Sequence, residues 1–161
     1  MMSKTISSNQ FLNFLTIIFF GLVVGQIVLA VVAYFLINKN IVKGSNELEQ
    51  LLFFSIPSFI LFSFFGGNFI YKNLLNKINF EDEINLKQKT YFKALIFKYG
   101  LLESGGIFAF VAVILTGNYV FLIFSGIVIL LFIYNKPTQA KLIKDLKLNE
   151  SDIFNFNETS I

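Results

Sequence analysis

Only one acidic side chain lies within the long apolar segments of this sequence, and it is the residue best placed to do chemistry. Glu103 falls in the apolar segment 94–116, where a serine and two glycines follow it directly. Ionisable side chains inside a membrane are costly and usually mark ion, proton or partner contacts. Glu103 is therefore a candidate for reversible binding of a proton or cation, with Gln26 and Ser104 as the other candidate residues.

A purely structural role for Glu103 is the alternative. Its carboxylate could pair with Lys98, Lys93 or a lysine of the C-terminal tail, which would anchor the helix at the headgroup level of the membrane. It could also be a protonated carboxyl group that bonds Ser104 or Gln26 for packing. Both kinds of role stay open at this point, with the structural anchor as the preferred interpretation.

The segments that must position these residues are four apolar runs. The chain of 161 residues is 55% hydrophobic and 14% charged, whereas an ordinary soluble domain is about 25% charged. About 18 apolar residues are enough for a helix to cross a bilayer. We predict an all-α integral membrane four-helix bundle over residues 1–135 and a cytoplasmic tail over 136–161, with the spans near 11–37, 51–74, 94–116 and 120–134.

Among the residue types missing from the sequence, three narrow the range of possible functions. The sequence has no Cys and no His, so it offers no thiolate nucleophile, no imidazole ligand and no histidine-based catalytic triad. It also has no Arg, the residue that nucleic-acid-binding proteins use most for bidentate contacts. We predict a protein that is not an enzyme, with no metal, no cofactor and no nucleic-acid partner. The lysine-only, Phe- and Asn-rich usage is typical of an AT-rich bacterial genome.

The lysines predict the orientation, because basic residues accumulate on the cytoplasmic side. The N-terminus, the connection between the second and third runs with its flanks, and the tail hold eleven of the thirteen lysines, and only Lys39 and Lys43 fall in the first outer connection. We expect both termini in the cytoplasm of a bacterium, with 38–49 and Gly117-Asn118 outside. The first run is too long for a signal-peptide core of about 7–15 residues, so we interpret it as a retained span.

Small residues predict where helices meet. Gly21 and Gly25 lie four apart in the first run, and Gly100 and Ser104 repeat that spacing in the third run, where Gly105 and Gly106 follow. Such spacings let two helix backbones approach closely.

The same two runs also resemble each other. A shift of 79 residues aligns 17–36 with 96–115 at seven identical positions. A duplicated two-helix hairpin and a chance match remain equally open.

The segment 101–115, LLESGGIFAFVAVIL, resembles the ion-binding helix of rotary ATPase proteolipids (subunit c). In that family a glutamate among small residues binds a proton or Na⁺ within a ring of helical hairpins. The resemblance implies the same role for Glu103. The sequence departs from the family in that Glu103 begins the first helix of its pair.

The tail predicts a short amphipathic helix after Pro137. Apolar Leu142, Ile143 and Leu146 alternate with lysines, which suits a helix on the cytoplasmic membrane surface. The alternative is docking on the connection between the second and third runs, where the acidic cluster 81–83 would receive the lysines.

Three functions remain open from the sequence. The preferred one is a subunit or accessory protein of a membrane complex, with the lipid bilayer and either further copies or other proteins as partners. The others are a proteolipid-like protein that handles protons or cations through Glu103, and a small transporter built as an oligomer.

Overall fold

The computed structural model describes residues 8–39, 41 and 46–148, which form five helices and no strand. The helices are α1 (Ser8–Asn38), α2 (Asn46–Leu75), α3 (Ile84–Thr116), α4 (Val120–Tyr134) and α5 (Gln139–Asp145). The predicted all-α class is confirmed. Lys4 and Lys43, which entered the topology prediction, lie outside the described residues, as does the tail beyond Leu148.

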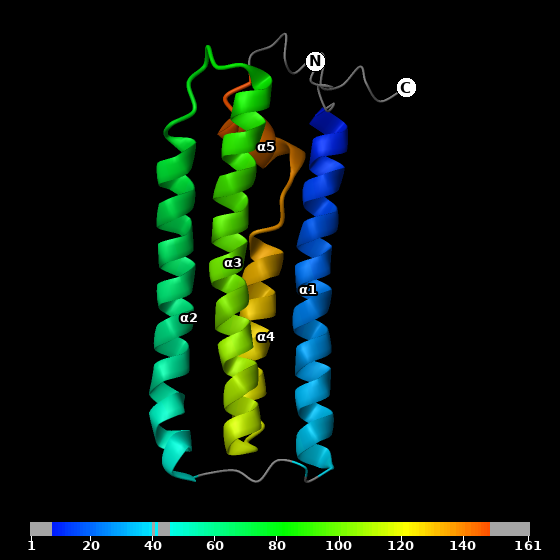
Figure 1. Cartoon of the computed structure of the whole chain (residues 1–161), viewed down its shortest axis with the longest axis vertical. Coiled ribbons are helices and arrows are strands. Elements are labelled where there is room, and N and C mark those ends of the chain that lie inside the picture. Colours follow the sequence, from blue (N-terminus) through cyan, green and yellow to red (C-terminus); the bar gives the residue numbers. More distant parts are fainter. Residues whose placement is uncertain (1–7, 40, 42–45, 149–161) are drawn as a thin grey trace.

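The helix α3 holds the bundle together, because α1, α2 and α4 all pack against it. In Figure 1 the four long helices stand side by side, and α1 and α3 run in the same direction. The two parallel helices meet level with each other, since Phe14 lies 5.7 Å from Phe92 and Phe19 lies 6.0 Å from Tyr99 between ring centroids. The start of α1, the α2–α3 connection and α5 share one end of the bundle, and the α3–α4 turn lies at the other (Figure 1).

Three helices, α1 to α3, are long and apolar enough to cross a membrane. They contain 31, 30 and 33 residues, which at about 1.5 Å per residue exceeds a hydrocarbon layer of about 30 Å. Helix α4 has only 15 residues. It reaches span length only when joined to α5, from which it is bent by 69°. The structure thus has three to four helices able to span, in line with a multi-pass membrane protein.

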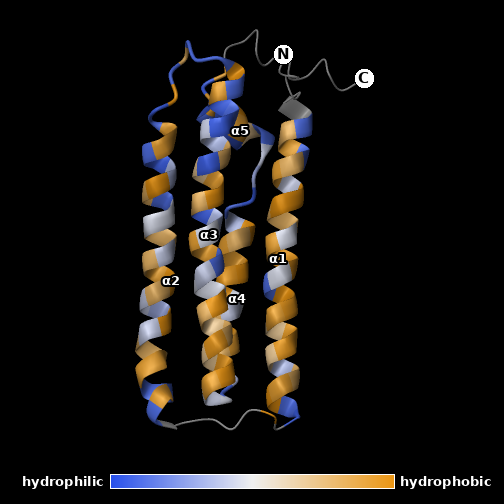
Figure 2. Ribbon diagram, in the orientation of Figure 1, coloured by the Kyte–Doolittle hydropathy of each residue, from blue (hydrophilic) through white to orange (hydrophobic). Residues whose placement is uncertain are grey.

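The outer surface of the bundle is apolar, and its interior contains a cluster of packed aromatic rings. Large side chains on every long helix are exposed, among them Ile17, Phe54, Phe62 and Leu130. Inside, Phe19, Tyr99 and Phe132 form a three-ring cluster from α1, α3 and α4. Figure 2 shows hydrophobic residues along the length of the four helices and hydrophilic ones gathered at the end that carries α5. A surface of this kind suits contact with lipid rather than water.

Close contacts between α2 and α3 form at one predicted glycine, Gly105, and at one that was not predicted, Gly67. A Cβ at Gly105 would contact Ile60 at 3.4 Å, and one at Gly67 would contact the Lys98 carbonyl oxygen at 3.3 Å, so α2 and α3 meet there.

Gly106 lies under the Gln26 side chain of α1, whereas three of the other predicted glycines have no close neighbour within the described chain. At Gly21, Gly25 and Gly100, no atom of another described element lies within 4 Å of the Cβ position. These three glycines face outward because they lie off the buried stripe of Phe19, Val23 and Gln26 on α1 and the buried Tyr99 on α3. A role for them in contacts with other chains stays a prediction.

The segment after α4 is docked on the α2–α3 connection, which was the alternative to a helix on the membrane surface. Leu142 and Leu146 are fully buried. The Lys147 ammonium donates to the Ile78 carbonyl oxygen, and the buried Lys87 ammonium donates to those of Phe80 (2.9 Å) and Lys147 (3.3 Å).

The sequence predicted that the carboxylates of 81–83 would accept the hydrogen bonds of the tail lysines. These carboxylates are not the acceptors in the contacts just described. Backbone carbonyl groups accept the lysine hydrogen bonds instead, and the Asp82 carboxylate accepts the backbone N–H of Asn79 at 2.8 Å. The docked segment therefore closes one end of the bundle rather than forming a separate surface helix.

Candidate functional site

The structure brings Gln26 and Glu103 together, on facing sides of α1 and α3. Gln26 is 1% exposed, and its Nε2 donates to the backbone carbonyl oxygen of Glu103 at 3.4 Å. The amide lies directly over Gly106, because a Cβ at that position would overlap the Gln26 side chain. Gly106 is therefore the residue that makes room for a buried amide between the two helices.

The Glu103 carboxylate has one oxygen atom that is buried without a partner among the described residues. The side chain is partly buried, and its Oε2 atom is shielded from solvent without a hydrogen-bond partner in the described part of the chain. Ser104 does not supply one, since its hydroxyl donates to the Leu101 carbonyl oxygen of its own helix at 2.7 Å. Of the three candidate residues, Gln26 and Glu103 thus share a site, and Ser104 is occupied by its own backbone.

The anticipated pairing of Glu103 with Lys98 does not form. The Lys98 ammonium lies 4.6 Å from the centroid of the Tyr71 ring and lines a cavity nearer the α5 end. By the helical rise, Glu103 lies about 7.5 Å along α3 from Lys98 and about 20 Å from Thr116 at the far end. The carboxylate therefore lies inside the apolar length of α3, not level with the lysines.

Sequence reasoning missed Ser63 as a candidate. Ser63 on α2 is 1% exposed, and its Oγ atom is buried without a partner in the described chain. It lies between Ile60, which packs on Gly105, and Gly67, which packs on Lys98. That register places Ser63 at the level of Glu103. A signal was present, because Ile56, Ile60, Ser63 and Gly67 follow the 4-3-4 spacing of one buried helix face.

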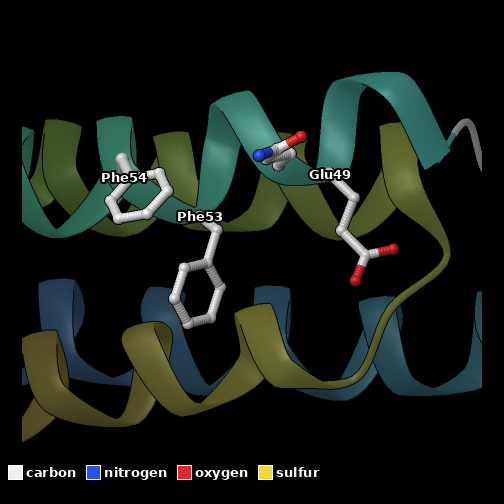
Figure 3. Close-up of a pocket in the computed structure, with 4 residues that line it drawn as sticks. Glu49, Phe53 and Phe54 are labelled. Atoms are coloured by element: carbon white, nitrogen blue, oxygen red, sulfur yellow. The ribbon is translucent and has the colours of Figure 1, made fainter.

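A carboxylate at the other end of the bundle is used for structure. Glu49, Gln50, Phe53 and Phe54 line a small pocket of about 300 Å³ on α2. Figure 3 shows Glu49 and Phe53 directed from α2 toward the neighbouring helices. The Asn118 side chain donates to Glu49 Oε1 at 2.6 Å, and the Phe53 ring meets that of Phe124 at 6.3 Å. Glu49 thus ties α2 to the α3–α4 turn.

No protein-family model, curated protein or solved structure matches this chain. Within the described residues, no group of three or more Asp or Glu side chains is placed to hold a metal ion. The arrangement offers one carboxylate, one amide and one free hydroxyl at a common depth. Such a set can take a proton, a small monovalent cation, or a donor from another chain.

Proposed function

We propose that this protein is a non-enzymatic subunit or accessory protein of a larger complex in the cytoplasmic membrane of a bacterium. In this proposal the lysine-rich end with α5 faces the cytoplasm, so both termini lie inside. The apolar outer surface and the lysine distribution support the location. The observation that carries the proposed role is the shielded Glu103 oxygen, which has no partner among the described residues.

An unsatisfied carboxylate in a membrane is costly, so the folded chain gains free energy when a donor reaches it. Gly100 lies one helical turn from Glu103 and is exposed, with open space at its Cβ position. A second transmembrane helix can approach most closely over such a residue. Because the Glu103 side chain is only partly buried, a neighbouring protein could bring a donor to the accessible part of this side chain at this point of α3.

The experiment is to compare the size of the complex that contains the protein in native membranes. The expected result is a species well above the 18.4 kDa of the chain, which is lost in Gly100→Leu. Gly126→Leu is the matched control, because Gly126 on α4 is equally exposed and has equally open space at its Cβ. A monomeric wild type, or equal loss of the complex in both variants, would contradict the proposal.

A second candidate function is proteolipid-like handling of a proton or cation by Glu103. The same shielded oxygen beside a buried amide favours it, since Gln26 could bond either protonation state. Carbodiimide reagents react with protonated, membrane-embedded carboxyl groups, so they should label Glu103 but not Glu49. Slower labelling in Na⁺ would indicate cation binding. Labelling of both carboxylates at equal rates, or of neither, would count against this function.

A further inference from the structure

A polar cavity of about 520 Å³ lies where α4 ends, between α2, α3 and the connection to α5. Four lysines line it: Lys72 from α2, Lys98 from α3, and Lys141 and Lys144 from α5. Asp145 is the one carboxylate among the lining residues. The cavity therefore carries an excess of positive charge on walls that belong to three different elements.

The carboxylate of Asp145 is already occupied. The Tyr71 hydroxyl donates to its Oδ2 at 2.6 Å, which fixes α5 to α2. The Lys98 ammonium lies over the ring of the same tyrosine, and Lys141 donates to the backbone oxygens of Tyr134 and Lys136. The ammonium groups of Lys98 and Lys141 are thus held by a ring and by carbonyl groups, which leaves their charges available to an anion.

The remaining walls offer neutral groups suited to a phosphate ester. Asn68, Tyr91 and Asn135 also line the cavity. Asn135 is fixed in place, because its backbone oxygen accepts the Tyr99 hydroxyl at 2.9 Å and its side chain donates to Leu131 at 2.7 Å. A second hollow of about 270 Å³ adjoins this one and shares Lys72, Lys144 and Asp145 with it. The space is ample for a headgroup as well as its phosphate.

The depth of the cavity identifies the source of the anion. From Thr116 at the far end, Lys98 lies about 27 Å along α3, close to the thickness of a hydrocarbon layer of about 30 Å. Lys98 is therefore close to the level of the phosphates of one leaflet, and the other three lysines line the same cavity. Basic pockets at that depth on the cytoplasmic side suit anionic headgroups. We infer that this cavity binds the phosphate of an anionic lipid headgroup.

This inference rests on the proposed membrane insertion and is independent of the proposed role of Glu103. The test uses the full chain purified in a zwitterionic detergent, with phosphatidylglycerol or phosphatidylcholine added and bound lipid counted by native mass spectrometry. Wild type should retain phosphatidylglycerol and not phosphatidylcholine. Lys98→Gln with Lys141→Gln should weaken retention about thirtyfold, which corresponds to about 1 kcal/mol for each lysine.

The matched control is Lys89→Gln with Lys93→Gln, which removes the same charge from exposed positions of α3 outside the cavity. It should retain the lipid as wild type does. A second double variant, Lys72→Gln with Lys144→Gln, changes only exposed lining residues and should weaken binding without affecting the fold. Equal loss in the control, or no loss in either cavity variant, would overturn the inference.

Competition with soluble phosphates tests whether the anion bound in the cavity is a lipid headgroup or a free phosphate. Inorganic phosphate and glycerol 3-phosphate, added at the concentration of the lipid, should not displace phosphatidylglycerol. Displacement at equal concentration would show a site for soluble phosphate and would overturn the assignment to lipid.

Discussion

The middle of the bundle and its lysine-rich end treat buried polar groups differently. At the lysine-rich end the Lys87 ammonium has two carbonyl acceptors, and Tyr71 has a carboxylate partner. The Gln88 Nε2 atom is an exception there, since it is buried without a partner in the described chain. In the middle, the Glu103 Oε2 and Ser63 Oγ atoms are likewise buried without a partner in the described chain. The lysine-rich end is thus closed mainly by contacts within the chain, whereas the Glu103 level is left less complete.

The difference indicates where each region obtains its stability. A buried group that has its partners costs little to keep and much to break, because truncation of one member leaves the other unsatisfied. A group that has none costs free energy until something else supplies a partner. The lysine-rich end should therefore be sensitive to polar truncation, and the Glu103 level should be sensitive mainly to changes of volume.

The largest effect should follow from filling the space over which Gln26 lies. Gly106→Val forces the Gln26 amide out of its place. Because Gln26 is buried, its amide has no open space to move into, and overpacking of this kind costs about 1–3 kcal/mol. Gly126→Val, where the Cβ position is open, should stay close to wild type. Thermal unfolding in detergent measures both. Adding Gln26→Ala to Gly106→Val should recover part of the loss, and a lack of recovery would break the assigned contact.

Removing the buried lysine should be the next largest effect. Lys87→Met leaves the carbonyl oxygens of Phe80 and Lys147 without this donor, at a cost of about 1–3 kcal/mol. The exposed neighbour Lys89→Met is the control. Limited proteolysis should cut the segment after α4 faster in Lys87→Met only. Equal cleavage in the two variants would show that Lys87 does not hold this segment.

A smaller effect is expected from Tyr71→Phe. The change removes one hydrogen bond to Asp145 and keeps the ring under Lys98, so the expected loss is about 1 kcal/mol. Tyr134→Phe is the control, because that side chain is 74% exposed. Hydrogen exchange of the α5 amides reports the loosening directly. Unchanged exchange in Tyr71→Phe would mean that apolar burial alone fixes α5.

The smallest effect is expected from Glu103→Gln, and this variant tests the comparison of the two regions most directly. Glu103→Gln removes a carboxylate without a partner for its shielded oxygen and keeps the side-chain shape, so the unfolding midpoint should stay equal or rise slightly. Glu49→Gln, by contrast, disturbs the hydrogen bond to Asn118 and should lower it by about 1 kcal/mol. A clear drop in Glu103→Gln would show that the two regions do not differ as described.

The apolar runs predicted the helices well, because each of these helices is apolar over most of its length and such a run is easy to recognise in a sequence. Glu103 and Gln26 were found for the complementary reason, since polar residues stand out within such runs. The structure brings these two candidates into contact between α1 and α3.

Other features left weaker signals. A pair such as Gly21 and Gly25 shows that close approach is possible but not which face meets a neighbour, and in the chain these glycines face outward. The docking of the tail uses backbone carbonyl groups as acceptors, and these are present at every residue. Nothing in the residue types therefore pointed to Ile78 or Phe80 as the acceptors.

The contacts that close the lysine-rich end also impose an order on biosynthesis. They join residues 60, 69 and 74 positions apart: Lys87 with Lys147, Ile78 with Lys147, and Tyr71 with Asp145. A ribosome makes the earlier member of each pair several seconds before the later one, at about 5–20 residues per second. The first three helices are therefore complete while this end is still open. Completion of the nascent chain is then the step that seals the molecule.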